Sequence, residues 1–295
     1  MASLREVKDR IGSVNNTRKI TSAMKMIASS KLHRAQAAIT NFLPYSEKLN
    51  TILSNLLSAD SGYESPYAQQ REVKKTAIIA FSSNSSLCGA FNANVIKEAN
   101  AVYAAQKKLN GDKNIEIYAI GKKVAEAFRK KGIQTVGDYQ ELLDKPAYLP
   151  VADLSYRLID KYLNKEIDRI VLVYHHFKST ASQVIVRKTL LPFDLDSAKT
   201  QAMQQTSGYQ ADYIFEPSRD EILGALIPKV LVSTLFAALL DSVASEHAAR
   251  TIAMQTATDN ADDLLQELKI QYNKTRQQSI TNELLDIIAG AAALE

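Results

Sequence analysis

Apolar and small side chains recur every three or four residues along the N-terminal part of the chain, from Ser3 to about Leu57. This spacing is typical of a helix with a narrow coiled-coil seam, which Arg18 and Lys25 interrupt. We expect Pro44 to kink or interrupt the helix, because proline lacks a backbone donor and clashes with the preceding turn. The seam residues are Leu4, Val7, Ile11, Val14, Thr21, Ala28, Leu32, Ala35, Ile39 and Phe42.

The same spacing returns after Pro217 and continues almost to the C-terminus. Ser218 and Glu221 have the spacing of a capping box at a helix start, and Pro228 is expected to bend the first turns. About 70 helical residues reach on the order of 100 Å, far longer than a small domain needs. We therefore expect the two terminal helices to pair as an antiparallel coiled coil. The C-terminal seam contains many small side chains and consists of Leu226, Val230, Ser233, Ala237, Leu240, Ala244, His247, Thr251, Met254, Thr258, Ala261, Leu265, Leu268, Tyr272 and Thr275.

Two stretches of this C-terminal segment are unusually apolar. The first, 222–240, is long enough to cross a bilayer, but Lys229 lies near its middle, which favours a buried helix. The second, Leu284–Leu294, is apolar on nearly every face and lies beyond the reach of any local core. An exposed apolar end of this kind promotes aggregation, so we expect another protein to enclose it.

The middle of the chain alternates strand-like and helix-like runs. We predict strands at Thr76–Phe81, Ile115–Ile120, Arg169–Phe177 and Gln183–Leu191, and helices at Ala93–Leu109 and Lys122–Lys131. This order is a βαβ arrangement with a partly parallel sheet, in which the last two strands lie close enough in sequence to form a hairpin. Residues 59–66 are expected to be a linker, 194–209 a loop and 213–216 a possible last strand.

The pattern as a whole predicts an α/β protein with three segments. Residues 1–58 form the N-terminal shaft helix, 74–216 the central βαβ (Rossmann-like) domain and 217–295 the C-terminal shaft helix. The term shaft denotes the long antiparallel coiled coil of the two terminal helices.

The distribution of charge along the N-terminal helix indicates a binding partner. No acidic residue occurs between Asp9 and Glu47, although the formal net charge is only +4. Such a block indicates an acidic partner surface. A calmodulin, RNA or anionic-membrane partner is less well supported, because the helix has no aromatic anchors and its basic residues are not segregated to one face. The basic residues of the block are Arg10, Arg18, Lys19, Lys25, Lys31 and Arg34.

The sequence contains no convincing catalytic site. Cys88 follows the first predicted strand, where a thiol could act as a nucleophile, but no histidine is close in sequence. The loop that contains it, 82–92, lacks both the phosphate-loop and the dinucleotide-binding pattern, so a turn-and-cap role is expected for Asn84 and its neighbours. His175 and His176 alternate along a strand, so one should be buried and the other exposed. We expect no catalytic residue, cofactor or metal.

Compartment follows from two features of the sequence. The single cysteine excludes an internal disulfide and is typical of a reducing compartment. The N-terminus carries charges where a signal peptide would be apolar, so secretion is not expected.

Three separated segments resemble the gamma subunit of rotary F-type ATP synthases. They are Arg10–Ala28 with its continuation to Gln36, the loop Leu87–Asn92, and the C-terminal pair 245–261 and 272–284. The resemblance extends over the whole chain. Two departures are Asn84-Ser85-Ser86, where the family usually has Asp-Arg-Gly or similar, and Thr251-Ile252, where it usually has methionine after the arginine.

The resemblance implies a non-catalytic central-stalk rotor. It would turn inside the alpha/beta ring and couple ion flow to ATP synthesis or hydrolysis on the beta subunits. Its other partners would be the epsilon subunit and the membrane c-ring, with one copy per complex, as a peripheral protein on the cytoplasmic face of a bacterial inner membrane. The alternative is a basic-helix module that binds nucleic acid or an acidic protein. The implied coupling residues are Lys19, Met24, Lys25, Glu246, Arg250, Arg276, Gln277, Thr281, Glu283 and Ile288.

Overall fold

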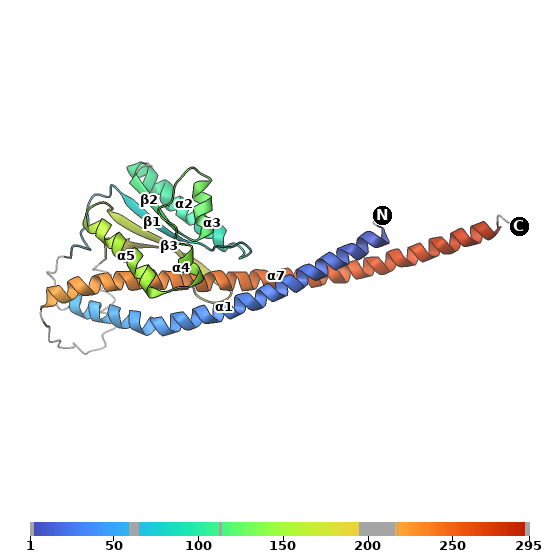
Figure 1. Ribbon diagram of the computed structural model, residues 1–295, viewed down its shortest axis with the longest axis horizontal. Coiled ribbons are helices and arrows are strands. Elements are labelled where there is room, and N and C mark those ends of the chain that lie inside the picture. Colours follow the sequence, from blue (N-terminus) through green and yellow to red (C-terminus); the bar gives the residue numbers. More distant parts are fainter. Residues whose placement is uncertain (1–2, 59–64, 112–113, 195–215, 217, 293–295) are drawn as a thin grey trace. The chain divides into compact units, whose positions relative to one another are not determined.

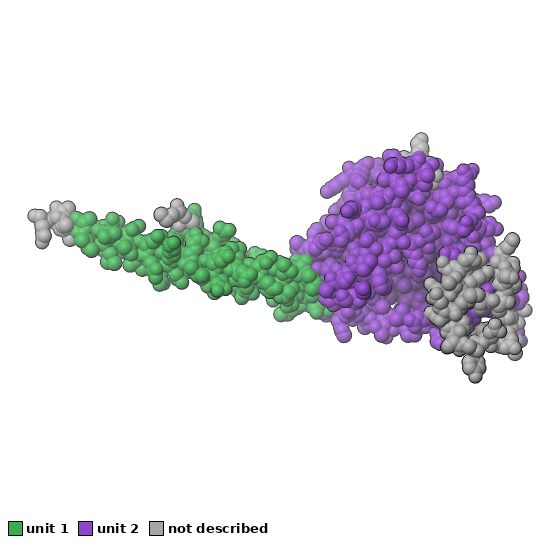
Figure 2. All heavy atoms as spheres, turned by 180° about the vertical axis from the view of Figure 1, so that it is seen from behind, with its two compact units in different colours: residues 1–29, 250–295 green, residues 30–249 purple. Residues whose placement is uncertain are grey.

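The fold was taken from a computed structural model, which describes residues 3–58, 65–111, 114–194, 216 and 218–292 (Figure 1). The chain divides by its contacts into two compact units, shown in Figure 2. Unit 1 contains residues 1–29 and 250–295, and unit 2 contains residues 30–249. Unit 1 combines the two ends of the chain, whereas the three segments predicted from the sequence follow one another along it. The boundaries of those three segments remain a prediction.

A four-stranded mixed sheet forms the centre of unit 2, in the order β2-β1-β3-β4. β1 (Thr76–Phe81) pairs in parallel with β2 (Ile115–Ile120) and β3 (Arg169–Phe177), and β4 (Gln183–Leu191) is antiparallel to β3. All four strands have the predicted bounds, and the predicted hairpin is confirmed. β1 is buried along its whole length, which explains why its sequence is continuously apolar.

Helices cover both faces of this sheet (Figure 1). Ile78 and Ala80 point to one face, against α2 (Phe91–Asn110) and α3 (Lys122–Arg129). Ile79 and Phe81 point to the other face, where α5 (Tyr148–Leu163) and the parts of both long helices that belong to unit 2 form a larger core. The alternation of neighbouring β1 residues between two cores is the period-two geometry of a strand.

The sequence analysis assigned no element between the predicted helix 122–131, which is α3 in the structure, and the third strand, where the structure has two more helices. These are the short α4 (Glu141–Asp144) and α5, whose Leu154, Leu158 and Tyr162 are almost fully buried. Pro150 lies in the first turn of α5, a position where proline is tolerated because that backbone donor has no helical partner.

A buried ion pair fixes the entry to the sheet. Arg71 Nε lies 2.6 Å from Asp168 Oδ1, and the guanidinium also donates to the carbonyls of Tyr162 and Ile167. Burial works to raise the pKa of Asp168, but hydrogen bonds from the amides of Lys75 and Lys74 and from Arg71 outweigh it and lower the pKa below its usual value. The charged carboxylate therefore joins the segment before β1 to the start of β3.

The two long helices are α1 (Leu4–Ser58) and α7 (Arg219–Ala292). Pro44 lies inside α1 and Pro228 inside α7 without ending either helix, so of the two expected effects of Pro44, a kink or an interruption, the interruption does not occur. Proline kinks a helix more readily than it stops one when surrounding contacts hold both sides. The Ser218 hydroxyl accepts a hydrogen bond from the Glu221 amide at 3.4 Å, as the capping pattern predicted.

An equivalent cap at the N-terminus was not predicted. The Ser3 amide donates to the Glu6 carboxylate at 2.7 Å, and the Glu6 amide donates to the Ser3 hydroxyl at 3.3 Å. The linker residues 59–64, the loop 195–209 and the proposed strand residues 213–215 lie outside the described residues.

One stretch of α7 is long and apolar enough to span a membrane by length and composition. However, 61% of its most apolar window is buried inside the protein. Leu223, Ile227, Leu231 and Leu235 all belong to the core of unit 2. This is the arrangement expected of a buried helix.

Candidate functional site

In unit 1, the first part of α1 and the last part of α7 form a helix pair with a thin core. Thr21, Ala28, Met254, Ala261 and Leu265 are among the buried residues of this pair. Every predicted seam position within the unit is buried or half-buried, which confirms the three-four spacing as an interior seam. The small residues keep the buried area low, so the pair gains little stability from its own apolar contacts.

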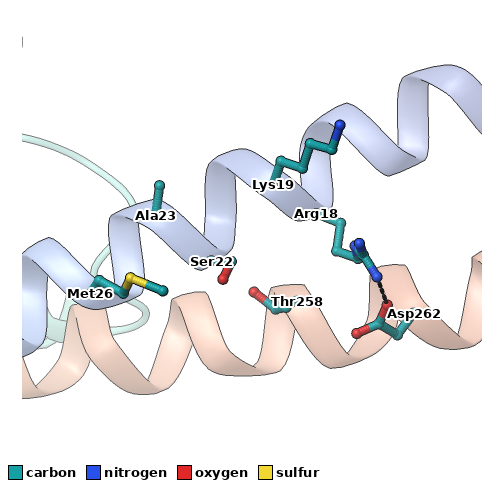
Figure 3. Close-up of a pocket in the computed structure, with 7 residues that line it drawn as sticks. All are labelled: Arg18, Lys19, Ser22, Ala23, Met26, Thr258 and Asp262. Carbon is teal, nitrogen blue, oxygen red and sulfur yellow. Dashed lines mark hydrogen bonds and ion pairs between the residues drawn. The ribbon is translucent and has the colours of Figure 1, made fainter.

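Among the described residues, three side-chain polar contacts across this helix pair stand out, and one of them, Arg18–Asp262, is drawn in Figure 3. Arg18 pairs with Asp262 at 2.9 Å, the hydroxyls of Thr21 and Thr258 lie 2.9 Å apart, and Lys25 Nζ donates to Gln255 Oε1 at 2.5 Å. The two positively charged residues that interrupt the predicted seam thus have partners on the opposite helix. The sequence showed that Arg18 and Lys25 interrupt the seam, but it did not show which residues of the opposite helix would pair with them.

A groove of about 380 Å³ lies beside these contacts on the surface of unit 1. Its lining, drawn in Figure 3, combines the positive Lys19, the apolar Met26 and the Arg18–Asp262 pair. Lys19 and Met26 are both exposed. The groove can therefore accept a negatively charged or apolar side chain from another molecule.

The ten predicted coupling residues occupy three different environments. Met24 and Lys25 are half-buried. Glu246 and Arg250 are each less than a tenth exposed, and both already have interactions within the chain. Burial leaves these two little surface for a partner. The fully exposed members of the set are Lys19, Arg276, Gln277, Thr281, Glu283 and Ile288.

The end of α7 is exposed throughout. Every residue from Thr281 to Gly290 is exposed, including Ile288 at 63%. Leu284, Leu285 and Ile287 are also more than half exposed. In water this would be an unfavourable apolar surface, so it indicates an enclosing partner.

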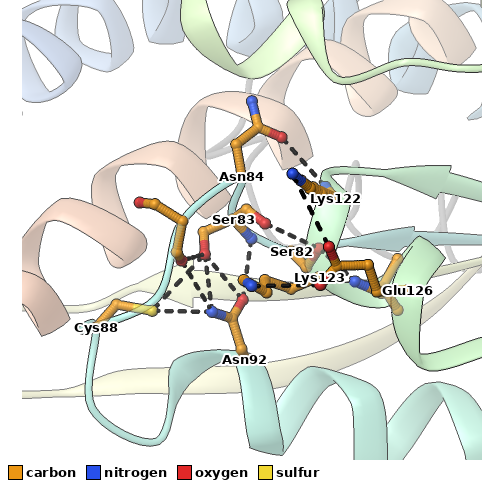
Figure 4. A network of polar contacts seen from close by, with 10 residues as sticks. Ser82, Ser83, Asn84, Cys88, Asn92, Lys122, Lys123 and Glu126 are labelled. Carbon is orange, nitrogen blue, oxygen red and sulfur yellow. Dashed lines mark hydrogen bonds and ion pairs between the residues drawn. The ribbon is translucent and has the colours of Figure 1, made fainter.

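The loop after β1 is structural (Figure 4). Cys88 is only 2% exposed, and its sulfur contacts the Asn92 side chain at 3.1 Å. The first amides of α3 are occupied by the same loop, since Lys122 N donates to Asn84 Oδ1 and Val124 N to Ser82 Oγ. An anion would have to displace these caps. The predicted turn-and-cap role of Asn84 is confirmed, although the helix that it caps is α3 and not the adjacent α2.

Gly121 explains how the loop can approach α3 so closely. Its φ of 110° lies in the region that favours glycine, and a Cβ at this position would lie 2.4 Å from the Ser82 carbonyl oxygen. The close approach brings Ser82 to the amide of Val124 at the start of α3.

The two adjacent histidines have opposite environments, as predicted. His175 is buried and stacks on Phe91 with a centroid distance of 4.4 Å, and burial lowers its pKa to about 4. His176 is exposed and its Nδ1 lies 2.7 Å from Asp241 Oδ2. Burial raises the pKa of Asp241, while the bonds from His176 and the Phe177 amide oppose that rise. No group of three metal-binding side chains occurs among the described residues.

Comparison with known proteins supports a single family. A family model described as ATP synthase matches residues 3–294. The ATP synthase gamma chain of Phocaeicola vulgatus is 56% identical over 293 residues, covering 99% of this chain and 100% of that protein. The gamma chain of Bacteroides fragilis is 57% identical, with the same coverage.

Solved structures share the fold at low sequence identity. A chain in the Euglena gracilis mitochondrial ATP synthase, in rotational state 3, has a TM-score of 0.65 at 19% identity, with 99% of this chain and 94% of that chain covered. A chain in the central stalk and c-ring structure of Tetrahymena thermophila mitochondrial ATP synthase has a TM-score of 0.56 at 21% identity, covering 81% and 99%. These similarities support the arrangement of two long helices with a mixed sheet.

Fold and helix pair together define a protein with a helix-covered mixed sheet and two long terminal helices, an arrangement shared with these solved structures. It is a non-catalytic subunit of a larger assembly. The chain belongs to the ATP synthase gamma-chain family of the F-type ATP synthases. This assignment supports the gamma-subunit resemblance over the alternative of a basic-helix module that binds nucleic acid or an acidic protein.

Proposed function

We propose that the helix pair turns inside a ring of alternating alpha and beta subunits. In this way the chain couples ion flow through the membrane sector to ATP synthesis or hydrolysis on the beta subunits. The observation that carries the proposal is the exposed apolar end of α7, with Leu284, Leu285 and Ile288 all more than half exposed. A sleeve of surrounding subunits would remove this surface from water while allowing it to turn.

Asymmetry supplies the coupling. The helix pair presents a different surface in each direction: a basic one with Lys19 on α1, and an acidic one on α7, where Asp259, Asp262, Asp263 and Glu267 are exposed. Each catalytic site around the pair would meet a different part of this surface. Rotation then changes the contacts of every site in turn, which is a coupling free energy between the rotor angle and nucleotide affinity.

The exposed members of the predicted set are the proposed contacts with the ring. The positive Lys19 and Arg276 would meet acidic loops, while Gln277, Thr281 and Glu283 would exchange hydrogen bonds. Ile288 would lie in the sleeve. Met24 and Lys25 would contribute through their half-exposed parts.

Glu246 and Arg250 would act in a different way. Both are buried, so we assign them to holding the helices in position and not to direct contact with the ring. Substituting either residue would then reduce coupling through the packing of the chain itself.

The remaining partners are the epsilon subunit and the membrane c-ring, with one copy of this chain in each complex. Similar chains occur in structures described as a central stalk with c-ring and as a rotor. The similar gamma chains of Phocaeicola vulgatus and Bacteroides fragilis are bacterial. We accordingly place the chain as a peripheral protein on the cytoplasmic face of the bacterial inner membrane.

Purification of the tagged chain from its own cells tests the assembly. We expect alpha and beta subunits to be recovered in molar excess over this chain, and the isolated chain to show no ATP hydrolysis. Recovery of the chain without these subunits, or ATPase activity that depends on Cys88, would contradict the proposal.

A further inference from the structure

Three successive polar contacts run along the seam in unit 1: the Thr21–Thr258 contact lies in the seam and the other two flank it. Going along α1, Arg18, Thr21 and Lys25 advance by three and four residues, and their partners on α7 run in the opposite direction. The partners are Asp262, Thr258 and Gln255. The layers therefore belong to one antiparallel register. The same stepping extends this register outward to the apolar pair Ile11 and Leu268.

Polar contacts between two helices add little to the stability of the pair, so a different role explains these contacts better. Arg18 and Asp262 are roughly half exposed, with side-chain exposures of 40% and 52%, so solvent screens their attraction. The Thr21 side chain is buried, and its hydroxyl requires a partner there. A buried polar residue in a coiled coil typically specifies register at a cost in stability.

Sliding the helices by one heptad breaks this arrangement. In one direction, Arg18 would face Lys269, which opposes like charges, and Thr21 would face Leu265, which leaves its hydroxyl only the bond to the Arg18 carbonyl. Of the three residues on α1, only Lys25, facing Asp262, would find a polar partner. In the other direction, Arg18 would face Gln255 and Lys25 would face Ala248, which leaves Asp262 without its cation. Only the observed register satisfies all three layers.

The apolar layers discriminate much less between registers. Ala28 and Ala261 are small, and a heptad shift replaces one small or apolar seam residue by another at most positions. Burial is nearly proportional to area and has no direction, so such a seam tolerates sliding. The polar layers thus supply the discrimination that the small side chains lack.

We infer that Arg18, Thr21 and Lys25, with Asp262, Thr258 and Gln255, form a register clasp that sets, within unit 1, the axial position of the first part of α1 against the last part of α7. These are positioning residues. The clasp keeps the exposed residues of α1 at the same position along the axis of the helix pair as those of α7. When the rotor turns, both sets of residues then face the same level of the surrounding subunits. Only this last consequence, for coupling, rests on the proposed function.

The test replaces the clasp by apolar residues in the full chain and reads the register with cysteines. The variant combines Arg18→Leu, Thr21→Val, Lys25→Leu and Thr258→Val. Cysteines at Ile11 and Leu268 report the native register, and cysteines at Ile11 and Thr275 report a one-heptad shift. We expect the shifted disulfide to increase by about tenfold, while the helix pair melts no earlier than in the parent.

A matched control places the same residue changes on exposed positions. It combines Lys8→Leu, Arg10→Leu, Thr17→Val and Thr256→Val, all off the seam. This variant should keep the native disulfide and form no more of the shifted one. If the clasp variant also keeps the native register, the proposed role of the clasp is refuted, and apolar packing alone sets the register.

A charge swap remains informative if the apolar variant fails to fold. Arg18→Asp should weaken the native disulfide, and Arg18→Asp with Asp262→Arg should restore it. Absence of rescue by the double variant would overturn the role of this pair. Proton pumping per ATP, measured in the assembled complex, is a separate readout. A shifted register with normal pumping would support the clasp and count against the proposed coupling function.

Discussion

Unit 2 and unit 1 are built on opposite principles. In unit 2, a sheet covered by helices on both faces buries large side chains such as Tyr162, Phe81 and Phe128 completely. In unit 1, the helix pair buries a narrow seam in which small or polar residues such as Ala28 and Thr21 occur beside larger ones such as Leu265, and it leaves apolar residues such as Ile288 exposed. One unit is therefore stabilised by its own core, whereas the other has a surface suited to being enclosed by partners.

The largest difference should appear when one apolar side chain is truncated in each unit. Leu158→Ala removes a side chain that is 1% exposed, and it should lower the free energy of unfolding by about 2–5 kcal/mol. Ile288→Ala removes one that is 63% exposed, and it should change stability by less than about 0.5 kcal/mol. Urea unfolding of the isolated chain measures both. Equal losses would show that the end of α7 has a core of its own.

The Arg71–Asp168 pair tests how much a largely buried ion pair contributes to the stability of unit 2. Arg71→Ala leaves the largely buried Asp168 carboxylate without its cation, and should cost about 3 kcal/mol. Lys74→Ala is the control, because its pair with Glu72 is exposed and should contribute less than about 1 kcal/mol. Thermal unfolding at neutral pH distinguishes the two. A similar loss for both variants would refute the buried-pair interpretation.

Acid should destabilise unit 2 through His175. Its pKa is about 4 in the folded protein, below the usual 6.5, so the unfolded chain binds more protons between these values. Stability should therefore fall as the pH decreases through this window, by about 2 kcal/mol from pH 8 to pH 5. His175→Gln should flatten that part of the profile. An unchanged profile for His175→Gln would contradict the assignment.

A smaller effect is expected from widening the seam of unit 1. Ala261 is buried between the helices, so Ala261→Leu should overpack them at a cost of about 1–2 kcal/mol. The neighbouring Gln266 is exposed, and Gln266→Leu serves as the control. In the assembled complex we expect Ala261→Leu to hydrolyse ATP with less proton pumping. Normal assembly and pumping would mean that the seam can relax around the added volume.

The sequence predicted local structure well where one period dominated. The apolar run Thr76–Phe81 was placed with the bounds of β1, because a strand buried on both faces is continuously apolar between turn residues. The seam of α7 was recognisable because its fifteen positions keep the three-four spacing from Leu226 to Thr275, beyond any local effect of Pro228. Helix α5 was missed, since its apolar face and its early proline were not weighed against the surrounding turn residues.

Contacts between distant parts of the chain were less predictable. Arg18 and Lys25 were visible as interruptions of the seam, but Asp262 and Gln255 became their partners only through the antiparallel register. Glu246 and Arg250 were chosen as interface residues on the basis of the family resemblance, and their burial depends on how the helices pack. Sequence spacing gives the face of a helix, while burial depends on what covers that face.

The central claim is that the end of α7 turns relative to its surroundings. A cysteine at Glu283, which is exposed, can be linked to a matching cysteine on one beta subunit in the assembled complex. The link fixes the rotor angle, so the catalytic sites can no longer be driven through their sequence of affinities. We predict that multi-turnover ATP hydrolysis stops when the disulfide is complete and returns on reduction. Full activity with the link verified as complete would contradict an obligatory rotor role for this end of the helix.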